Sequence, residues 1–226
     1  MFKRVCLLVL GLLVAGGPTS GWPGDREATR EATALAAAIQ AHYDNVRDFR
    51  ADFIHTYQGG VLRRKAVERG RVAIRKPGRM RWVYTHPEEK VFVSDGSRMY
   101  SYVPADKQVY VAALPGEDQA TTPTLFLTGR GDLTRDFVAE RTSVEGAPEG
   151  TLALKLTPRR EEREYEWLIL VVDRESYALR MLVTADRQGG TSAFAFTNLK
   201  ENTGIPDKEF VFSIPRGVDV ITDAGR

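Results

Sequence analysis

The chain has 226 residues, of which 42% are hydrophobic and 27% are charged, as expected for one globular domain with a sizeable core. Its 32 basic and 30 acidic residues nearly balance, which disfavours a nucleic-acid partner. After the N-terminal apolar run, no segment of the sequence is apolar enough to span a membrane.

The first 21 residues have the pattern of a secretory signal peptide. A positive start at Lys3-Arg4 precedes an apolar run, Val5–Ala15, that is too short to span a bilayer as a folded helix. We expect cleavage after Gly21, since cleavage after Gly17 would be followed directly by Pro18. An uncleaved membrane anchor is the alternative. The expected organisation is a signal peptide at 1–21 and one domain at 22–226.

The single cysteine, Cys6, lies inside the apolar run and lacks the small-residue frame of a lipidation site. It is expected to leave with the signal peptide. The remaining chain would then have no thiol and no disulfide, so its stability would come from packing alone.

The mature chain is predicted to begin with a helix at Asp25–Tyr43, where alanine is frequent and Leu35 and Ile39 recur at helical spacing. A strand is predicted at Phe49–Tyr57, with every second residue from Phe49 on one face. A charged strand is predicted at Val61–Val67, after a glycine turn.

The stretch Val72–Gly96 has the clearest alternation in the chain and predicts a three-stranded meander. A proline-glycine turn at Lys76–Arg79 separates its first two strands, and Val91–Val93 forms the third. One face carries Val72, Ile74, Met80, Trp82 and Tyr84, whereas the opposite face is mostly basic or small.

Further strands are predicted at Met99–Val103, Gln108–Ala112, Phe137–Arg141, Leu152–Thr157, Tyr165–Val172, Ala178–Thr184, Thr191–Leu199 and Phe210–Ile214. Leu114–Arg135 differs, because Thr122–Thr128 has a helix start and Leu133 belongs to a second short helical piece. Regular strand spacing without long intervening helices predicts antiparallel pairing throughout. The expected fold class is mainly β (α+β), with about ten strands in a single curled antiparallel sheet that forms an incomplete β-barrel. A few helices would cover it as a lid.

Motifs for catalysis or metal binding are missing from the sequence. The three histidines are not spaced as a metal pair, and no Gly-x-Ser-x-Gly elbow, phosphate loop or dinucleotide fingerprint occurs. We therefore expect a protein without enzymatic activity, cofactor or metal. A lipid-acting hydrolase is the disfavoured alternative.

Three apolar groups are candidates for a binding groove. They are the meander face (Val72, Ile74, Met80, Trp82, Tyr84), the first strand (Phe49, Phe53) and the helix-start run (Leu125, Phe126). One interpretation is a filled core. The other is a groove for acyl chains, in which each buried methylene contributes about 0.8 kcal/mol without specific contacts.

The order of several short motifs resembles the LolA/LolB family of outer-membrane lipoprotein carriers. These motifs are Lys76-Pro-Gly-Arg-Met-Arg-Trp82-x-Tyr84-x-x-Pro87, Val93-Ser-Asp-Gly96 and Tyr102-Val-Pro104. The resemblance extends from Val46–Phe53 to Phe210–Val218, nearly the whole mature chain. Cys6 does not fit the lipidated cysteine of the receptor branch, so the soluble, LolA-like branch is favoured.

The resemblance implies an incomplete antiparallel barrel with helices as a lid, located in the periplasm. It implies transport of acylated lipoproteins from an inner-membrane ABC transporter to an outer-membrane receptor by a monomeric carrier. The family's groove positions match Met80, Trp82 and Tyr84. The family's lid-closing arginine corresponds to Lys76, and Arg75 precedes it, so either residue could close the lid. A periplasmic lipid-sensing regulatory domain of the same architecture is the alternative function.

Overall fold

The computed structural model describes residues 23–59, 65–114, 127, 131–162 and 165–222, and places them in one long helix and one large sheet. The helix is α1 (Pro23–Asn45). The strands are β1 (Asp48–Gln58), β2 (Lys65–Arg75), β3 (Arg79–His86), β4 (Lys90–Asp95), β5 (Arg98–Val103), β6 (Gln108–Ala113), β7 (Phe137–Thr142), β8 (Thr151–Pro158), β9 (Trp167–Asp173), β10 (Leu179–Ala185), β11 (Thr191–Glu201) and β12 (Asp219–Thr222). Short helical pieces are η1 (Pro104–Asp106), α3 (Leu133–Asp136) and η3 (Asp207–Phe210).

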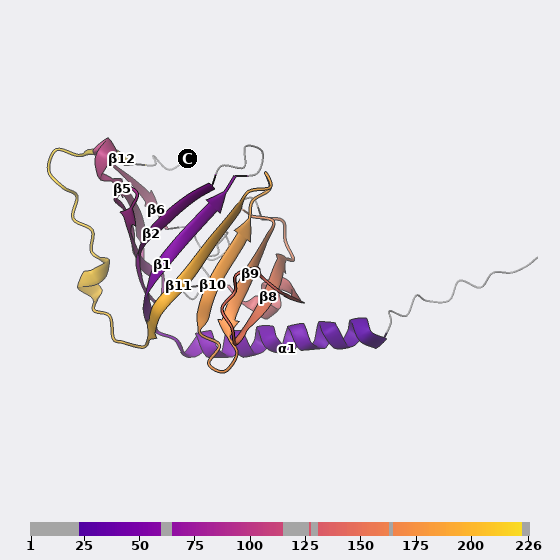
Figure 1. The fold of residues 1–226 in the computed structure, drawn as a ribbon. Helices are drawn as coiled ribbons and strands as arrows, with labels where there is room; N and C mark the ends of the chain where they lie inside the picture. The colour runs from indigo at the N-terminus through magenta and orange to yellow at the C-terminus, as the bar shows by residue number, and fades with distance from the viewer. Residues whose placement is uncertain (1–22, 60–64, 115–126, 128–130, 163–164, 223–226) are drawn as a thin grey trace, which may run out of the picture.

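The twelve strands form one sheet in the order β12-β6-β5-β4-β3-β2-β1-β11-β10-β9-β8-β7. Strands β1 and β11 join the two halves of the sheet. In the described residues the edge strands β7 and β12 do not pair, so the curled sheet is not closed. Figure 1 shows α1 lying across one end of this sheet. The predicted fold class, an incomplete barrel with few helices, is confirmed.

The two faces of the sheet differ as strand alternation predicts. In β1, Phe49 and Phe53 are buried while Arg50 is exposed. In β3, Trp82 is buried, whereas its neighbours Arg81 and Val83, which belong to the opposite face, are only partly buried. We call the face with Phe49, Phe53 and Trp82 the inner face, and the face with Arg50, Arg71 and Arg81 the outer face.

Gly70 lets the aromatic side chains of neighbouring strands meet on the inner face. It lies opposite Phe53 in β1 and Tyr84 in β3. A Cβ at this position would stand 2.1 Å from the Val83 carbonyl oxygen and 2.7 Å from Cζ of Phe53. Only glycine therefore fits here without moving backbone.

Helix α1 contributes an apolar stripe to the same core. The stripe consists of Ala32, Leu35, Ala36, Ile39 and Tyr43, all at most 7% exposed. These residues belong to one buried cluster with the inner face of the sheet, and α1 contacts β7, β8 and α3. The predicted helix is confirmed, and it begins two residues earlier, at Pro23.

One predicted strand, Phe210–Ile214, is wrong. Phe210 ends the short helix η3, and the following residues have no strand partners. They belong to an extended segment, residues 202–218, which we call the C-terminal strap. It runs outside the sheet from β11 to β12 (Figure 1). The last strand is β12, which pairs with β6 in parallel, so the expectation of antiparallel pairing throughout is also wrong at this edge.

Two other predicted elements are not found as separate elements with the predicted bounds in the described residues. The strand predicted at Val61–Val67 and the first strand of the meander are parts of one strand, β2, in the described residues. The predicted helix at Thr122–Thr128, with Leu125 and Phe126, lies outside the described residues except for Leu127, which is helical and fully buried.

In the described part of the chain, no helix has both the length and the apolarity needed to cross a bilayer.

Candidate functional site: an aromatic inner face and the helix at its end

The predicted groove residues come together on the inner face of adjacent strands. The register aligns Phe49, Ile74 and Met80 in one row and Val72 with Trp82 in the next. Each of the seven described candidates is at most 8% exposed, namely Phe49, Phe53, Val72, Ile74, Met80, Trp82 and Tyr84. In this state they form part of a packed core.

Aromatic rings form a continuous layer in the middle of this face. The ring centroid of Phe53 lies 5.1 Å from that of Trp82 and 4.9 Å from that of Tyr84, both edge to face. Phe194 of β11 joins the layer, with its centroid 5.2 Å from that of Trp82. Neither Phe194 nor the buried Phe196 was predicted from the sequence as a site residue, although their spacing of two residues on a strand was a usable signal.

The C-terminal turn of α1 is attached to the sheet at two sides of Tyr43. The ammonium group of Lys76, in the turn between β2 and β3, donates a hydrogen bond to the backbone carbonyl of Tyr43. On the other side, the backbone N–H of Leu179 in β10 donates to the Tyr43 hydroxyl at 3.1 Å. A further contact joins His42 Nε2 to Glu201 Oε1 at 3.1 Å. The end of the helix therefore bridges strands that lie several positions apart in the sheet.

The position of the Lys76 ammonium group beside the end of α1 determines its pKa and its contact with the Tyr43 ring. Burial lowers the pKa of Lys76, while the carboxylates of Asp44 and Glu201 oppose that shift. The ammonium also lies 5.7 Å from the ring centroid of Tyr43, within range of a cation–π interaction. Lys76 thus holds the helix end by a single charged donor rather than by a two-pronged guanidinium.

Arg75, the other candidate for closing the lid, points to a different part of the molecule. Its guanidinium donates to the carbonyl of Ile205 at 2.9 Å and to Asp207 Oδ1 at 2.7 Å. Both acceptors belong to the C-terminal strap, so Arg75 attaches the strap to β2.

A polar cluster lies on the inner face beyond the aromatic layer, at the end opposite to Lys76. It consists of His55, Glu68, Lys90 and Ser192, which come from four different strands. His55 Nδ1 lies 3.1 Å from Glu68 Oε2, and His55 Nε2 lies 2.7 Å from Ser192 Oγ. Lys90 Nζ donates to Glu68 Oε1 at 2.5 Å. No pattern in the sequence pointed to this cluster.

The electrostatics of this polar cluster favour a neutral histidine beside an ionised glutamate. Burial lowers the pKa of His55 more than its contacts with Glu68 raise it. Burial would raise the pKa of Glu68, but the hydrogen bonds and charges of Lys90 and His55 outweigh it and hold that pKa below its usual value.

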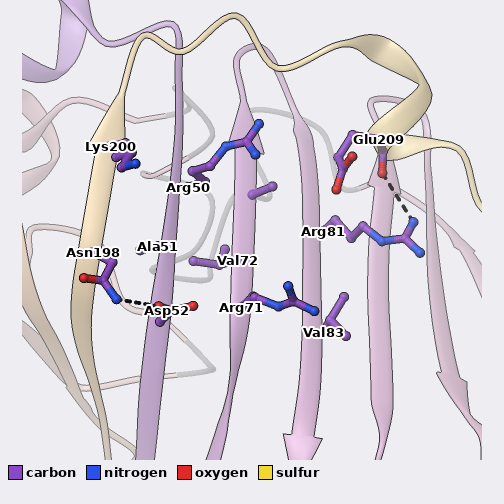
Figure 2. Close-up of a pocket in the computed structure, with 11 residues that line it drawn as sticks. Arg50, Ala51, Asp52, Arg71, Val72, Arg81, Val83, Asn198, Lys200 and Glu209 are labelled. Carbon is purple, nitrogen blue, oxygen red and sulfur yellow. Dashed lines mark hydrogen bonds between the residues drawn. The ribbon is translucent and has the colours of Figure 1, made fainter.

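The outer face carries a basic hollow of about 460 Å³ between β11, β1, β2, β3 and the strap (Figure 2). Its cations are Arg50, Arg71, Arg81 and Lys200, and its acidic residues are Asp52 and Glu209. Figure 2 shows Asp52 bonded to Asn198 and Arg81 bonded to the Glu209 carbonyl. The sheet separates this hollow from the aromatic layer. The basic side chains of the hollow agree with the sequence prediction that the outer face of the meander is mostly basic or small.

The described residues contain no group of three or more histidine, cysteine or acidic side chains placed to hold a metal ion. The arrangement instead offers a large apolar inner face, a helix at one end of the sheet that shares its buried cluster, and a few polar contacts that hold the helix in place. Such a surface can bind alkyl chains if the helix moves away.

Comparisons with known proteins agree with this geometry. A family model described as "Outer membrane lipoprotein carrier protein LolA" matches residues 44–213. A protein from Nitrosospira multiformis, named outer-membrane lipoprotein carrier protein, is 30% identical over 195 residues, which cover 86% of this chain and 91% of that protein. A protein of the same name from Chromohalobacter salexigens is 33% identical and covers 85% of this chain and 89% of its own length.

A solved structure gives the same picture of the fold. An uncharacterized conserved protein from Thermus thermophilus superposes with a TM-score of 0.54 and covers 83% of this chain and 99% of that chain. Its sequence identity is 12%, so this likeness concerns the fold alone.

Proposed function

Because the chain belongs to the LolA family of outer membrane lipoprotein carrier proteins, we propose that it binds the acyl chains of lipoproteins released from the inner membrane and delivers them to the outer membrane. It works in the periplasm by binding and release, without catalysing a reaction. The curated relatives do not favour the alternative of a lipid-sensing regulatory domain.

The observation that carries this proposal is that α1 belongs to the same buried cluster as the apolar inner face and is attached to the sheet mainly by side chains. A helix, α1, shares one buried cluster with the aromatic layer, and polar contacts at Lys76 and Tyr43 hold its end. A helix can move away from a sheet without breaking backbone hydrogen bonds between strands, whereas a strand paired with the sheet cannot. The inner face is thus the acyl site of the open form and the core of the closed form.

The energies are compatible with exchange between these forms. A hydrogen bond from a charged donor contributes about 1.5–3 kcal/mol. A buried methylene contributes about 0.8 kcal/mol, so a few methylenes of one alkyl chain offset the loss of the Lys76 contact. Incoming acyl chains can therefore displace the helix and take over its apolar contacts.

The remaining parts of the proposal concern place and partners. Residues 1–21 act as an export signal, and residues 22–226 form the carrier domain. An inner-membrane ABC transporter supplies the lipoprotein, an outer-membrane receptor accepts it, and the carrier acts as a monomer. Leu125 and Phe126 complete the acyl groove together with the seven described inner-face residues, and Lys76 rather than Arg75 closes the lid.

A transfer assay with a latch variant tests the proposal. Purified carrier is loaded with a lipoprotein from inner-membrane vesicles that contain the transporter and ATP, and delivery to outer-membrane vesicles is followed. Lys76→Leu should release α1 in the empty protein, raise the binding of a hydrophobic dye and reduce delivery several-fold, since the groove then opens without cargo.

The matched control is Lys65→Leu, which changes an exposed lysine at the start of β2. It should load and deliver like the wild type. If the wild-type protein takes no lipoprotein from the vesicles, the carrier function is refuted. If Lys76→Leu delivers as well as the wild type, Lys76 does not close the lid.

A further inference from the structure

We propose that the polar cluster of His55, Glu68, Lys90 and Ser192 is a second subsite of the groove, which binds the ester carbonyls of the acylated glyceryl group of the cargo. This inference rests on the proposed carrier function and specifies how the cargo is oriented. The alkyl chains would run along the aromatic layer toward Lys76, and the ester groups would lie at the polar cluster.

The position of the cluster matches the boundary between a polar and an apolar part of a ligand. His55 follows Phe53 by two residues on the inner face of β1, and its ring stacks on Phe194 with centroids 4.1 Å apart and planes at 5°. Lys90 lies opposite Tyr84, with its ammonium 5.9 Å from that ring centroid. The polar groups therefore adjoin the last aromatic rings of the layer directly.

Water and a ligand can reach the cluster. The side chains of His55, Glu68 and Lys90 are 15%, 18% and 27% exposed, in contrast to the buried rings of Phe53 and Tyr84. Four strands fix the cluster, so its donors hold their places without help from α1.

Some hydrogen-bond donors of the polar cluster remain available for a ligand. An ionised Glu68 only accepts, so the proton of a neutral His55 is on Nδ1, and Nε2 accepts from the Ser192 hydroxyl. Lys90 uses one of its three N–H groups for Glu68. Its other N–H groups, and the hydroxyl of Ser192 after rotation, can donate to carbonyl oxygens.

The charge of the cluster selects the type of acceptor. Lys90 and Glu68 compensate each other, and His55 is neutral, so the net charge is close to zero. A phosphate would bring an uncompensated negative charge into this half-buried place. Ester carbonyls are neutral acceptors joined directly to alkyl chains, and they fit both the charge and the neighbouring aromatic surface.

The test compares two ligands that differ only in these carbonyls. One is a synthetic lipopeptide whose cysteine carries a glyceryl group with two palmitoyl esters, and the other has two hexadecyl ethers instead. Affinities are measured by displacement of a hydrophobic dye from the wild type, from Lys90→Met and from Ser192→Ala. Lys65→Met is the control for removing an ammonium group, and thermal melting verifies that each variant is folded.

We expect the wild type and Lys65→Met to prefer the ester ligand at least about tenfold, which corresponds to the lower end of the range for one hydrogen bond from a charged donor. Lys90→Met should bind both ligands equally, and Ser192→Ala should have a reduced preference. Equal binding of both ligands by the wild type overturns the subsite while the carrier function stands. Failure of both ligands to displace the dye from the wild type overturns the carrier function and the subsite with it.

Discussion

At the scale of single residues, the inner face depends on what neighbouring strands place opposite one another. Gly70 has no side chain because the rings of Phe53 and Tyr84 occupy the space on either side of it. The sequence predicted the alternation of the meander correctly, but a glycine between two arginines in a charged stretch gave no sign of this role. Its function becomes clear only once the register of three strands is known.

Replacement of Gly70 by alanine should lower the free energy of unfolding by about 3 kcal/mol, the upper end for overpacking, because its Cβ would meet a backbone oxygen at 2.1 Å. Urea unfolding of the purified variant measures this. Gly24→Ala in α1 is the control, because nothing lies within 4 Å of its added Cβ. An alanine at position 70 that is as stable as the wild type would refute the close approach of β2, β3 and Phe53.

His55 should make the stability of the protein sensitive to mild acid. Since burial lowers its pKa below 6.5, the unfolded chain binds a proton more readily than the folded protein. Its contribution to stability is therefore complete above pH 6.5 and is lost as the pH falls through the window below that value. The maximal slope for one such group is about 1.4 kcal/mol per pH unit.

Urea unfolding at pH 7.5 and at pH 5.5 measures this effect. The wild type should lose more stability between the two conditions than His55→Phe, in which the ring can still stack on Phe194. Glu68 retains Lys90 in the variant, and its own titration lies below pH 4.5 because its pKa is lowered. Equal losses in both proteins would show that His55 does not cause the acid sensitivity.

At the scale of elements, the sequence predicted what local patterns determine. Helix α1 and the hairpins of the meander follow from periodicity and turn residues, and the structure has them within a few residues. The C-terminal strap was mispredicted because an extended chain buries alternate residues even when it crosses strands instead of pairing with them. Phe210 is 1% exposed, and Phe212 packs near Tyr100 and Tyr102. The true last strand, β12, is exposed at every position and carries no alternation to detect.

The candidate site could also be predicted only where local sequence patterns determine it. The groove residues of β1, β2 and β3 share one continuous pattern and could be predicted together. The polar cluster, and the place of Phe194 beside Phe53 and Trp82, could not be predicted, because β11 pairs with β1 across more than a hundred residues of sequence. Such long-range pairing depends on the packing of the whole sheet and leaves no local signal.

The strap is held by specific side chains, and its attachment can be tested at Phe210. The buried carboxylate of Asp48 accepts from the backbone N–H groups of Thr203 and Gly204 at 2.8 and 3.0 Å and fixes the start of the strap. Phe210→Ala should cost about 3–5 kcal/mol, because it empties a fully buried site. Val211→Ala, at a residue that is 61% exposed, should change stability by less than about 0.5 kcal/mol.

Chemical unfolding followed by circular dichroism gives both values, and limited proteolysis reports the strap directly. Phe210→Ala should be cleaved faster within residues 202–218, while the sheet stays resistant. Equal stability of the two variants would mean that Phe210 does not hold the strap on the outer face.

At the scale of the whole molecule, a sheet of twelve hydrogen-bonded strands is combined with a helix that is attached to it through side chains. The sheet is linked by backbone ladders from β12 to β7, whereas α1 is linked to it by side-chain packing and by the contacts of Tyr43, Lys76 and His42. The weaker set of contacts breaks first. Loading should therefore move α1 relative to the sheet and leave the curl of the sheet nearly unchanged.

Two pairs of spin labels separate these motions, because residues 23–226 contain no native cysteine. The first pair joins α1 to the sheet, with cysteines at the exposed Ala37 and at Ile54, which is 40% exposed. The second pair joins two strands, Ile54 in β1 and Val138 in β7, which is 44% exposed. Without ligand, both pairs should give one narrow distance distribution by pulsed electron paramagnetic resonance. Excess lipopeptide should add a second, longer distance to the first pair only.

The Lys76→Leu change makes this prediction sharper, because it separates lid release from ligand binding. In that background the longer distance of the Ala37–Ile54 pair should be present before any lipopeptide is added, while the Ile54–Val138 distance stays the same. A lipopeptide that binds, as judged by dye displacement, without altering the Ala37–Ile54 distance would show that acyl chains bind without moving α1. A change confined to the Ile54–Val138 pair would instead mean that the sheet itself opens.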